Sequence, residues 1–198
     1  MRRMACWHRP LDRIGLVRNP TRAAALALLT SLAALTACTP SLNWRDVPLP
    51  PTTAQGLLPC KPDHAERSLP LGGEPTQLVV AGCAAGGATF AVMTTLVAAG
   101  RAPDALLDGW QQATLTNMHA AGDIARQPFH PAGGLPLAHA QRVAAAGQGP
   151  NGKPVHAQAV WSARAAAGGG TELLHAVVYS DRPLTEVADT FFAGLQWR

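Results

Sequence analysis

Short apolar runs joined by glycine-rich turns are the strongest constraint on how this chain folds. Gly72-Gly73, Gly86-Gly87 and Gly168-Gly169-Gly170 each separate two such runs, and Asn151-Gly152 lies between two more. Glycine and asparagine supply the positive φ angles that tight hairpin turns need. Connections this short join antiparallel neighbours. The spacing therefore predicts a series of β-hairpins along residues 60–180.

Alternation of side chains supports strands on both sides of Asn151-Gly152. In PVHAQAVWSARAA one face is predicted to carry Val155, Ala157, Ala159, Trp161 and Ala163. The other face is predicted to carry His156, Gln158, Val160, Ser162 and Arg164. This period of two is typical of a β-strand, and we expect TELLHAVVYS to be its neighbour.

One internal segment changes to a helical period. In APDALLDGWQQATLTNMHAAGD, spacings of three and four residues relate Leu107, Trp110, Thr114 and Met118, which predicts an amphipathic helix. Asp104 and Asp108 fall in the first turns of this helix, where carboxylates interact favourably with the helix dipole. We interpret these two acids as a solvated helix start rather than as a catalytic pair.

A second helix is predicted near the carboxyl end, in SDRPLTEVADTFFAGL. Asp181 is the expected capping residue and Pro183 is expected in the first turn, as is typical of helix starts. The predicted apolar face consists of Leu184, Val187, Ala188, Phe191 and Leu195.

The order of hairpins, helix, meander and helix predicts an α+β domain. We expect one antiparallel sheet with one inserted helix and one C-terminal helix packed on it. The element order and the strand, turn and closing helix in HAVVYSDRPLTEVADTFFAGL resemble the PsbP-like fold over residues 57–196. That resemblance implies a fold alone, because a fold does not determine function.

The first 37 residues have the pattern of an export signal. Residues 1–22 hold six arginines and one acid, and 15 uncharged residues follow from Ala23 to Ala37. As a helix, at ~1.5 Å per residue, this run would measure roughly 22 Å, whereas a bilayer core is about 30 Å thick. A basic start, a short apolar run and a small residue before the cut are typical of a signal peptide. We therefore predict a cleaved signal peptide over residues 1–37; the alternative is an uncleaved signal anchor with an incidental cysteine.

The residues Leu35-Thr36-Ala37-Cys38 resemble the lipobox of bacterial lipoproteins. The resemblance implies diacylglycerol transfer to the Cys38 thiol, cleavage before Cys38 and acylation of the new amino terminus. Three acyl chains exceed the two signals that stable anchoring requires. Thr39 stands where an Asp would indicate retention in the inner membrane in this class. We therefore expect a lipid-anchored protein of the bacterial outer membrane that faces the periplasm.

Proline density sets the predicted domain boundary. Residues 39–59 contain five prolines, a density typical of an extended linker. We predict a lipidated, proline-rich tether over residues 38–59 and a single α+β domain over residues 60–198. Within the tether, LNWRDV at residues 42–47 alternates in polarity and is a candidate first strand docked on the domain.

The charge of the processed chain argues against nucleic-acid binding. The whole chain has 16 basic and 12 acidic residues, of which the first 37 residues hold 6 and 1. The remainder therefore has 10 basic and 11 acidic residues, a net charge of −1. No cluster of Lys or Arg follows Cys38, whereas a basic patch is the usual footprint of a nucleic-acid partner.

Two cysteines remain available for pairing after processing. Cys6 is lost with the leader and Cys38 is acylated, which leaves Cys60 and Cys83. In an oxidising compartment such a pair is expected to form a disulfide. Closing a loop of about 24 residues would stabilise the fold by about 3.4 kcal/mol. A metal pair or a redox couple is the alternative, but neither cysteine lies in a CxxC motif.

The sequence predicts neither a catalytic motif nor a cofactor site. There is no GxSxG around any serine, as nucleophile-elbow hydrolases require. The histidines lack HxxxH, HExxH and HxH spacing, which would place two metal ligands on one face. We expect His156 and His175 on neighbouring strands and interpret them as surface or half-buried histidines. The alternative is a weak copper or zinc site in which the two face each other on the solvent side.

Two function classes remain open. The first is a non-enzymatic binding or accessory module of the bacterial envelope, anchored by lipid and docked on another envelope protein. The alternative is a metal-binding or carrier protein, or a small envelope enzyme, that uses a cleft near His156 and His175. We predict the first class, because the signal, the tether and the near-neutral charge are all typical of it.

Overall fold

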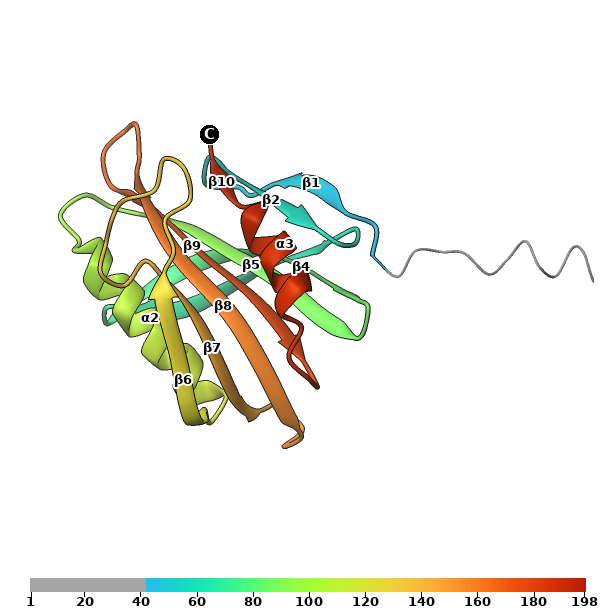
Figure 1. Cartoon of the computed structure of the whole chain (residues 1–198). Coiled ribbons are helices and arrows are strands. Elements are labelled where there is room, and N and C mark those ends of the chain that lie inside the picture. Colours follow the sequence, from blue (N-terminus) through green and yellow to red (C-terminus); the bar gives the residue numbers. More distant parts are fainter. Residues whose placement is uncertain (1–41) are drawn as a thin grey trace, which may run out of the picture. The chain divides into compact units, whose positions relative to one another are not determined.

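The structure, a computed structural model, describes residues 42–198 (Figure 1). The predicted signal peptide and Cys38 lie outside these residues. The elements along the chain are β1 (Arg45–Pro48), β2 (Ala54–Leu58), β3 (Asp63–Leu71), β4 (Glu74–Ala85), β5 (Ala88–Val97), α2 (Pro103–Asn117), β6 (Ala121–Pro128), β7 (Gln141–Gln148), β8 (Pro154–Ala165), β9 (Thr171–Ser180), α3 (Thr185–Ala193) and β10 (Gln196–Trp197).

Seven strands form one antiparallel sheet in the order β3-β4-β5-β9-β8-β7-β6. The predicted hairpins are confirmed. Leu71 pairs with Glu74 across Gly72-Gly73, and Ala85 pairs with Ala88 across Gly86-Gly87. All four of these glycines have φ between 58° and 84°, which other residues rarely adopt.

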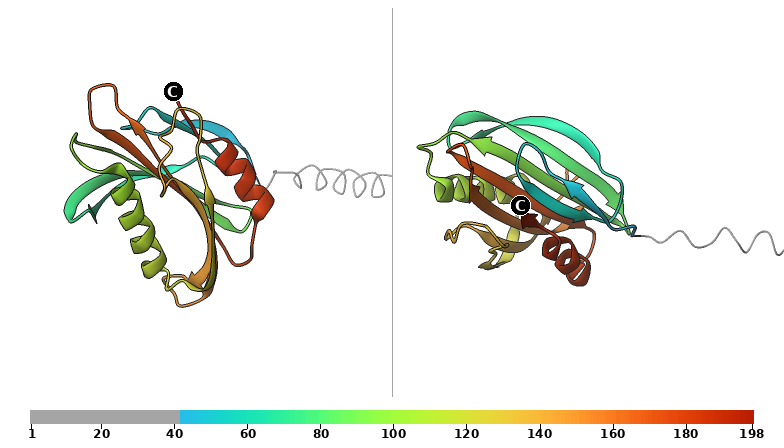
Figure 2. Two further views of the ribbon diagram at one scale, coloured as in Figure 1. Left: turned by 60° about the vertical axis from the view of Figure 1, so that its left-hand side comes forward. Right: turned by 90° about the horizontal axis from the view of Figure 1, so that it is seen from above.

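The two faces of this sheet are covered by different elements. Phe90 and Val92 of β5 point into a core shared with α3, whereas Ala91 and Met93 point toward α2. Figure 2 shows α2 and α3 on opposite sides of the sheet. The α+β class with helices packed on an antiparallel sheet is therefore confirmed. A second, smaller sheet was not predicted.

That smaller sheet shows that the predicted tether boundary is wrong. Its order is β1-β2-β10, so residues 45–58 belong to the domain, and the candidate strand at residues 42–47 overlaps β1. Leu49 and Leu58 are buried in the α3-side core. Pro48 ends β1, and Pro50 and Pro51 lie in the turn before β2. These prolines therefore lie at the end of β1 and in the turn of a hairpin. β1 is an edge strand, where proline is tolerated.

The two helices occur where the helical period predicts them. α2 buries Leu106, Leu107 and Trp110. α3 buries Ala188, Phe191 and Phe192. The predicted start of α3 is wrong, because the helix begins at Thr185 and not at Pro183, and Leu184 occupies the N-cap without a side-chain hydrogen bond.

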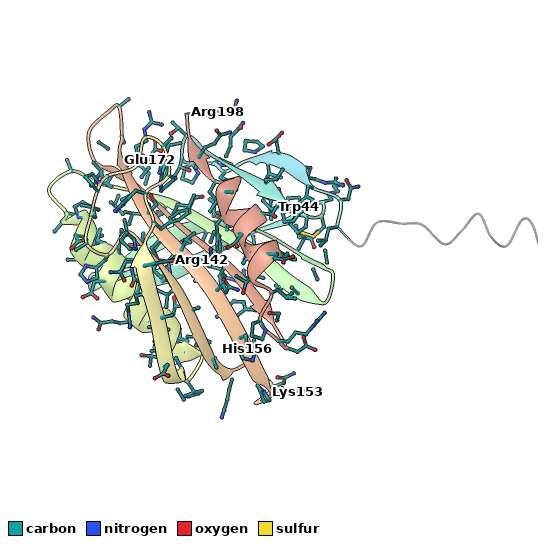
Figure 3. All side chains as sticks on the ribbon, in the orientation of Figure 1. Trp44, Arg142, Lys153, His156, Glu172 and Arg198 are labelled. Carbon is teal, nitrogen blue, oxygen red and sulfur yellow. A yellow bond between two sulfur atoms is a disulfide. The ribbon has the colours of Figure 1, made fainter. Side chains whose placement is uncertain are left out.

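A buried carboxylate fastens the small sheet to the large one. Glu172 of β9 is 5% exposed and accepts hydrogen bonds from the backbone N–H of Thr53 at 3.0 Å and from its hydroxyl at 2.8 Å. Arg164 donates to the same hydroxyl at 2.9 Å. Glu172 and Arg198 lie at one end of the sheet, and His156 and Lys153 lie at the other (Figure 3).

Residues 42–198 contain both hydrophobic cores and the disulfide, as an autonomously folding domain does. No helix within this part of the chain is long and apolar enough to cross a membrane.

Candidate functional site

Two concave regions lie on opposite faces of the large sheet. The first, which we call the α3 groove, has a volume of about 720 Å³ and runs over β6, β7 and β8 beside the start of α3. The second, the α2 pocket, has a volume of about 640 Å³ and lies between α2 and the sheet. Both volumes are within the range of small-molecule sites.

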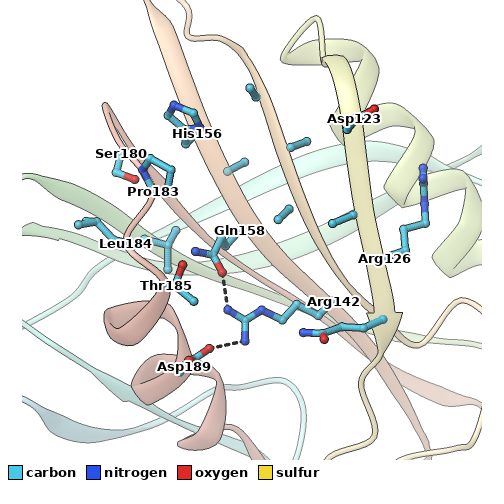
Figure 4. Close-up of a pocket in the computed structure, with 17 residues that line it drawn as sticks. Asp123, Arg126, Arg142, His156, Gln158, Ser180, Pro183, Leu184, Thr185 and Asp189 are labelled. Atoms are coloured by element: carbon cyan, nitrogen blue, oxygen red, sulfur yellow. Dashed lines mark hydrogen bonds and ion pairs between the residues drawn. The ribbon is translucent and has the colours of Figure 1, made fainter.

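Two charged side chains of the α3 groove, Arg142 and Asp189, form an ion pair. Figure 4 shows Arg142 of β7 between Gln158 of β8 and Asp189 of α3. Its guanidinium donates to both and lies 5.1 Å from the centre of the Phe192 ring. Arg142 thereby joins α3 to the sheet.

The α2 pocket is lined by uncharged residues from six parts of the chain. They are Leu69, Thr89, Met93, Trp110, Ala113, Thr114, Asn117, Met118, Gln148, Gly149, Pro150, Val155, His175 and Tyr179. The carboxyl end of α2 is fixed against β7, where the backbone N–H of Gln148 donates to the carbonyl of Met118 at 2.6 Å. A Cβ at Gly147 would collide with that carbonyl, so glycine permits the close approach that shapes this end of the pocket.

Two aromatic rings pack against His175, which lines the α2 pocket. The His175 imidazole is parallel to the Trp161 indole, with ring centres 4.3 Å apart, and meets Trp110 edge-on at 5.3 Å. His175 Nδ1 lies 3.2 Å from the carbonyl oxygen of Val160. Because a carbonyl only accepts hydrogen bonds, Nδ1 carries the proton of the neutral ring and Nε2 is an acceptor.

Burial sets the protonation of the two titratable groups in the α2 pocket. Removal from water lowers the pKa of His175 to about 4, although the hydrogen bond to Val160 opposes this shift. Removal from water also raises the pKa of Tyr179. Both side chains are therefore neutral at pH 7, and so is the whole pocket lining.

Acidification should destabilise the domain through His175. Between the usual histidine pKa of 6.5 and the folded value of about 4, the unfolded chain binds a proton that the folded chain does not, so stability falls as the pH falls. At 1.36 kcal/mol per pH unit, the loss from pH 7 to pH 4.5 is about 2 kcal/mol, since both transitions are incomplete at the ends of this range. Urea unfolding at both pH values measures it.

Two variants isolate the contribution of His175. His175→Phe keeps a flat ring between the two tryptophans and removes the titrating nitrogen, so its stability should change by about 2 kcal/mol less over this pH range. His156→Gln, on the opposite face, should keep the slope of the unaltered protein. An unchanged slope in His175→Phe would contradict the assignment.

The structure does not bring the candidate metal ligands together. The alternative in which His156 and His175 face each other is wrong: His156 pairs with Ser180, and His175 pairs with Trp161. Because side chains alternate along a strand, His156 lies in the α3 groove and His175 lies in the α2 pocket. Within residues 42–198, no three His, Cys, Asp or Glu side chains are grouped as metal ligands.

The acids at the start of α2 have a partner that the sequence did not indicate. Asp104 accepts hydrogen bonds from the backbone N–H of His139 at 2.8 Å and from its Nδ1 at 2.9 Å. His139 Nε2 lies 3.6 Å from a carboxylate oxygen of Asp108. Although partial desolvation opposes the shift, the bonds from His139 hold the pKa of Asp104 below its usual value. These contacts join α2 to the loop before β7. Asp104 and Asp108 are therefore tertiary contacts as well as a solvated helix start.

The predicted Cys60–Cys83 disulfide is present in the structure, with the two Cα atoms 6.1 Å apart. It joins the segment after β2 to β4, beside the Trp44 and Phe90 side chains of the α3-side core. The bond appears near Trp44 in Figure 3. It therefore holds the small sheet against the large one.

Comparison with known proteins finds no matching family model, no matching curated protein and no matching solved structure. The resemblances to lipoproteins and to the PsbP-like fold therefore stay predictions, and the geometry of residues 42–198 is the basis for a functional conclusion.

Proposed function

We propose that this chain is a lipid-anchored lipoprotein of the bacterial envelope, facing the periplasm, that acts as a non-enzymatic binding module. The observation that carries the binding role is the α2 pocket, a formed cavity of about 640 Å³ with a continuous uncharged lining. Pockets of this size with a few polar groups among apolar ones are typical of small-molecule binding sites.

The chemistry of the pocket supports binding rather than catalysis. Its lining contains no Ser, Cys, Asp or Glu, the usual nucleophiles and acids of hydrolytic sites. The one imidazole, His175, is held by Trp161 and by the carbonyl of Val160. A general base instead needs its pKa near the operating pH, and burial lowers the pKa of His175 to about 4.

Anchoring is tested by replacing the acylated cysteine. Cys38→Ala should leave an unlipidated precursor, because the lipid is attached to that thiol and each buried methylene contributes ~0.8 kcal/mol to membrane binding. Cys6→Ala is the matched control, since it removes a cysteine that the processed chain does not keep. Mass spectrometry of the amino-terminal peptide and membrane fractionation in the bacterial host measure both variants.

The expected result is an acylated Cys38 at the amino terminus of the unaltered protein and of Cys6→Ala, and neither processing nor acylation in Cys38→Ala. An unmodified chain that still begins at Met1 in a cytoplasmic fraction would contradict the proposal. The envelope protein on which the module docks would be identified by crosslinking in intact cells.

A further inference from the structure

The lining of the α2 pocket excludes ionised ligands. None of its residues is Asp, Glu, Lys or Arg, and its histidine is neutral at pH 7. A charge placed there would lose its hydration without gaining a counter-charge, which costs several kcal/mol. The α3 groove differs, since Asp123, Arg126, Arg142 and Asp189 line it.

The apolar part of the lining suits a flat ring system. Tyr179 is partly exposed and presents aromatic surface, whereas Trp110 is 2% exposed and packs behind the lining; Met93 and Met118 contribute flexible thioethers. Aromatic side chains bind flat rings by stacked or edge-on contacts, and methionines adapt to irregular shapes and contact aromatic rings favourably.

One polar group in the pocket is unused by the protein. His175 is 1% exposed, and its Nδ1 is directed to the backbone of β8 through Val160. Nε2, on the other side of the ring, has no hydrogen-bond partner among residues 42–198. Nε2 is not among the buried side-chain atoms of residues 42–198 that lack a partner, so solvent reaches it in the free protein. A ligand that excludes this solvent and donates an N–H or O–H to Nε2 restores its hydrogen bond, whereas a ligand without a donor leaves the acceptor unpaired at a cost of about 1–3 kcal/mol.

We propose that the α2 pocket binds an uncharged small molecule with a flat apolar body and one hydrogen-bond donor, which is received by His175 Nε2. This ligand class rests on the binding function proposed above. The absence of charged residues from the lining selects against ionised molecules. The hydrogen bond to the imidazole fixes the orientation of the bound ligand.

Three related fluorescent probes test the ligand class on residues 42–198. N-phenylnaphthylamine is neutral and has one N–H; anilinonaphthalene sulfonate has the same body with a negative charge; N-methyl-N-phenylnaphthylamine lacks the donor. We expect saturable binding of one N-phenylnaphthylamine per domain. The sulfonate should bind at least about tenfold more weakly, since its charge is desolvated, and the N-methyl probe roughly fivefold or more weakly, since Nε2 stays unpaired.

Substitutions on one helix locate the binding site. Ala113→Trp places a bulky side chain at the pocket, because Ala113 of α2 lines it. Ala105→Trp is the matched control, because Ala105 is an exposed alanine of the same helix that does not line the pocket. Thr89→Trp, which approaches from β5, serves if the helix variant unfolds. Circular dichroism and urea unfolding verify that each variant is folded.

The pocket variants should weaken N-phenylnaphthylamine binding about tenfold or more, since the added indole occupies the site of the ligand's apolar body. Ala105→Trp should change it less than twofold. Equal binding of the neutral and sulfonated probes, no loss in either pocket variant, or no saturable binding would overturn the ligand class. These outcomes are separate from the anchoring test, because a chain that binds the probe but fails to be acylated would overturn only the envelope role.

Discussion

Replacement of Phe90 by alanine is expected to lower the free energy of unfolding by about 4 kcal/mol, as is typical of buried phenylalanines. Phe90 is fully buried. Its ring meets Trp44, before β1, with centres 6.3 Å apart, and Phe191 of α3 at 5.4 Å, both edge-on. Truncation would therefore open a cavity where β5, the small sheet and α3 all meet.

Leu96→Ala is the matched control for this prediction. Leu96 belongs to the same strand, but it is 52% exposed, so its truncation should change stability by roughly 0.5 kcal/mol or less. Urea unfolding of both variants, followed by tryptophan fluorescence, gives the comparison. Similar losses for Phe90→Ala and Leu96→Ala would contradict the packing described for the α3-side core.

Removal of the disulfide is expected to have the second large effect on folding. The double variant Cys60→Ser with Cys83→Ser should lose about 3.4 kcal/mol, because the unfolded chain regains the entropy that closure of a loop of about 24 residues removes. Unfolding in guanidinium at neutral pH, with and without a reductant, measures the loss.

The reductant supplies the control for the disulfide prediction. It should lower the stability of the unaltered protein to that of the double variant and leave the double variant unchanged, since only the bond distinguishes them. Equal stability of the unaltered protein in both conditions would show that Cys60 and Cys83 are not joined in solution.

Local signals were sufficient to predict most of the large sheet. The glycine pairs at residues 72–73 and 86–87 fix both the turns and the register of the hairpins that they close. The alternation along β8 likewise separates its faces, with Val160 in one core and Trp161 in the other. Turns and side-chain alternation depend on residues close together in the sequence, so a single sequence is sufficient to predict them.

The small sheet could not be predicted in this way. Prolines around β1 and β2 have the composition of a linker, and only tertiary contacts with α3 and β5 make this segment part of the core. β10 has two residues, too few for any periodicity. The α2 pocket is similarly non-local, since its lining combines β3, α2 and β9.

The error at His156 and His175 has a geometric cause. The sequence places the two histidines on adjacent strands, but the turn at residues 166–170 pairs Ala165 with Thr171. A shift of one residue in this register would reverse the face of every side chain on β9. The turn geometry therefore decides which cavity receives each imidazole.

The pairing of β10 with β2 determines when, during synthesis, the domain can complete its folding. Gln196 pairs with Gln55, and Trp197 donates from its indole to the hydroxyl of Ser162 at 3.3 Å. A polypeptide delivered amino end first, from a ribosome or through a translocation pore, presents β2 long before its outer neighbour exists. Pairing over so long a stretch of sequence is slow. Until Trp197 emerges, the outer edge of β2 is uncovered and can pair with other chains, so β10 protects that edge once it is in place.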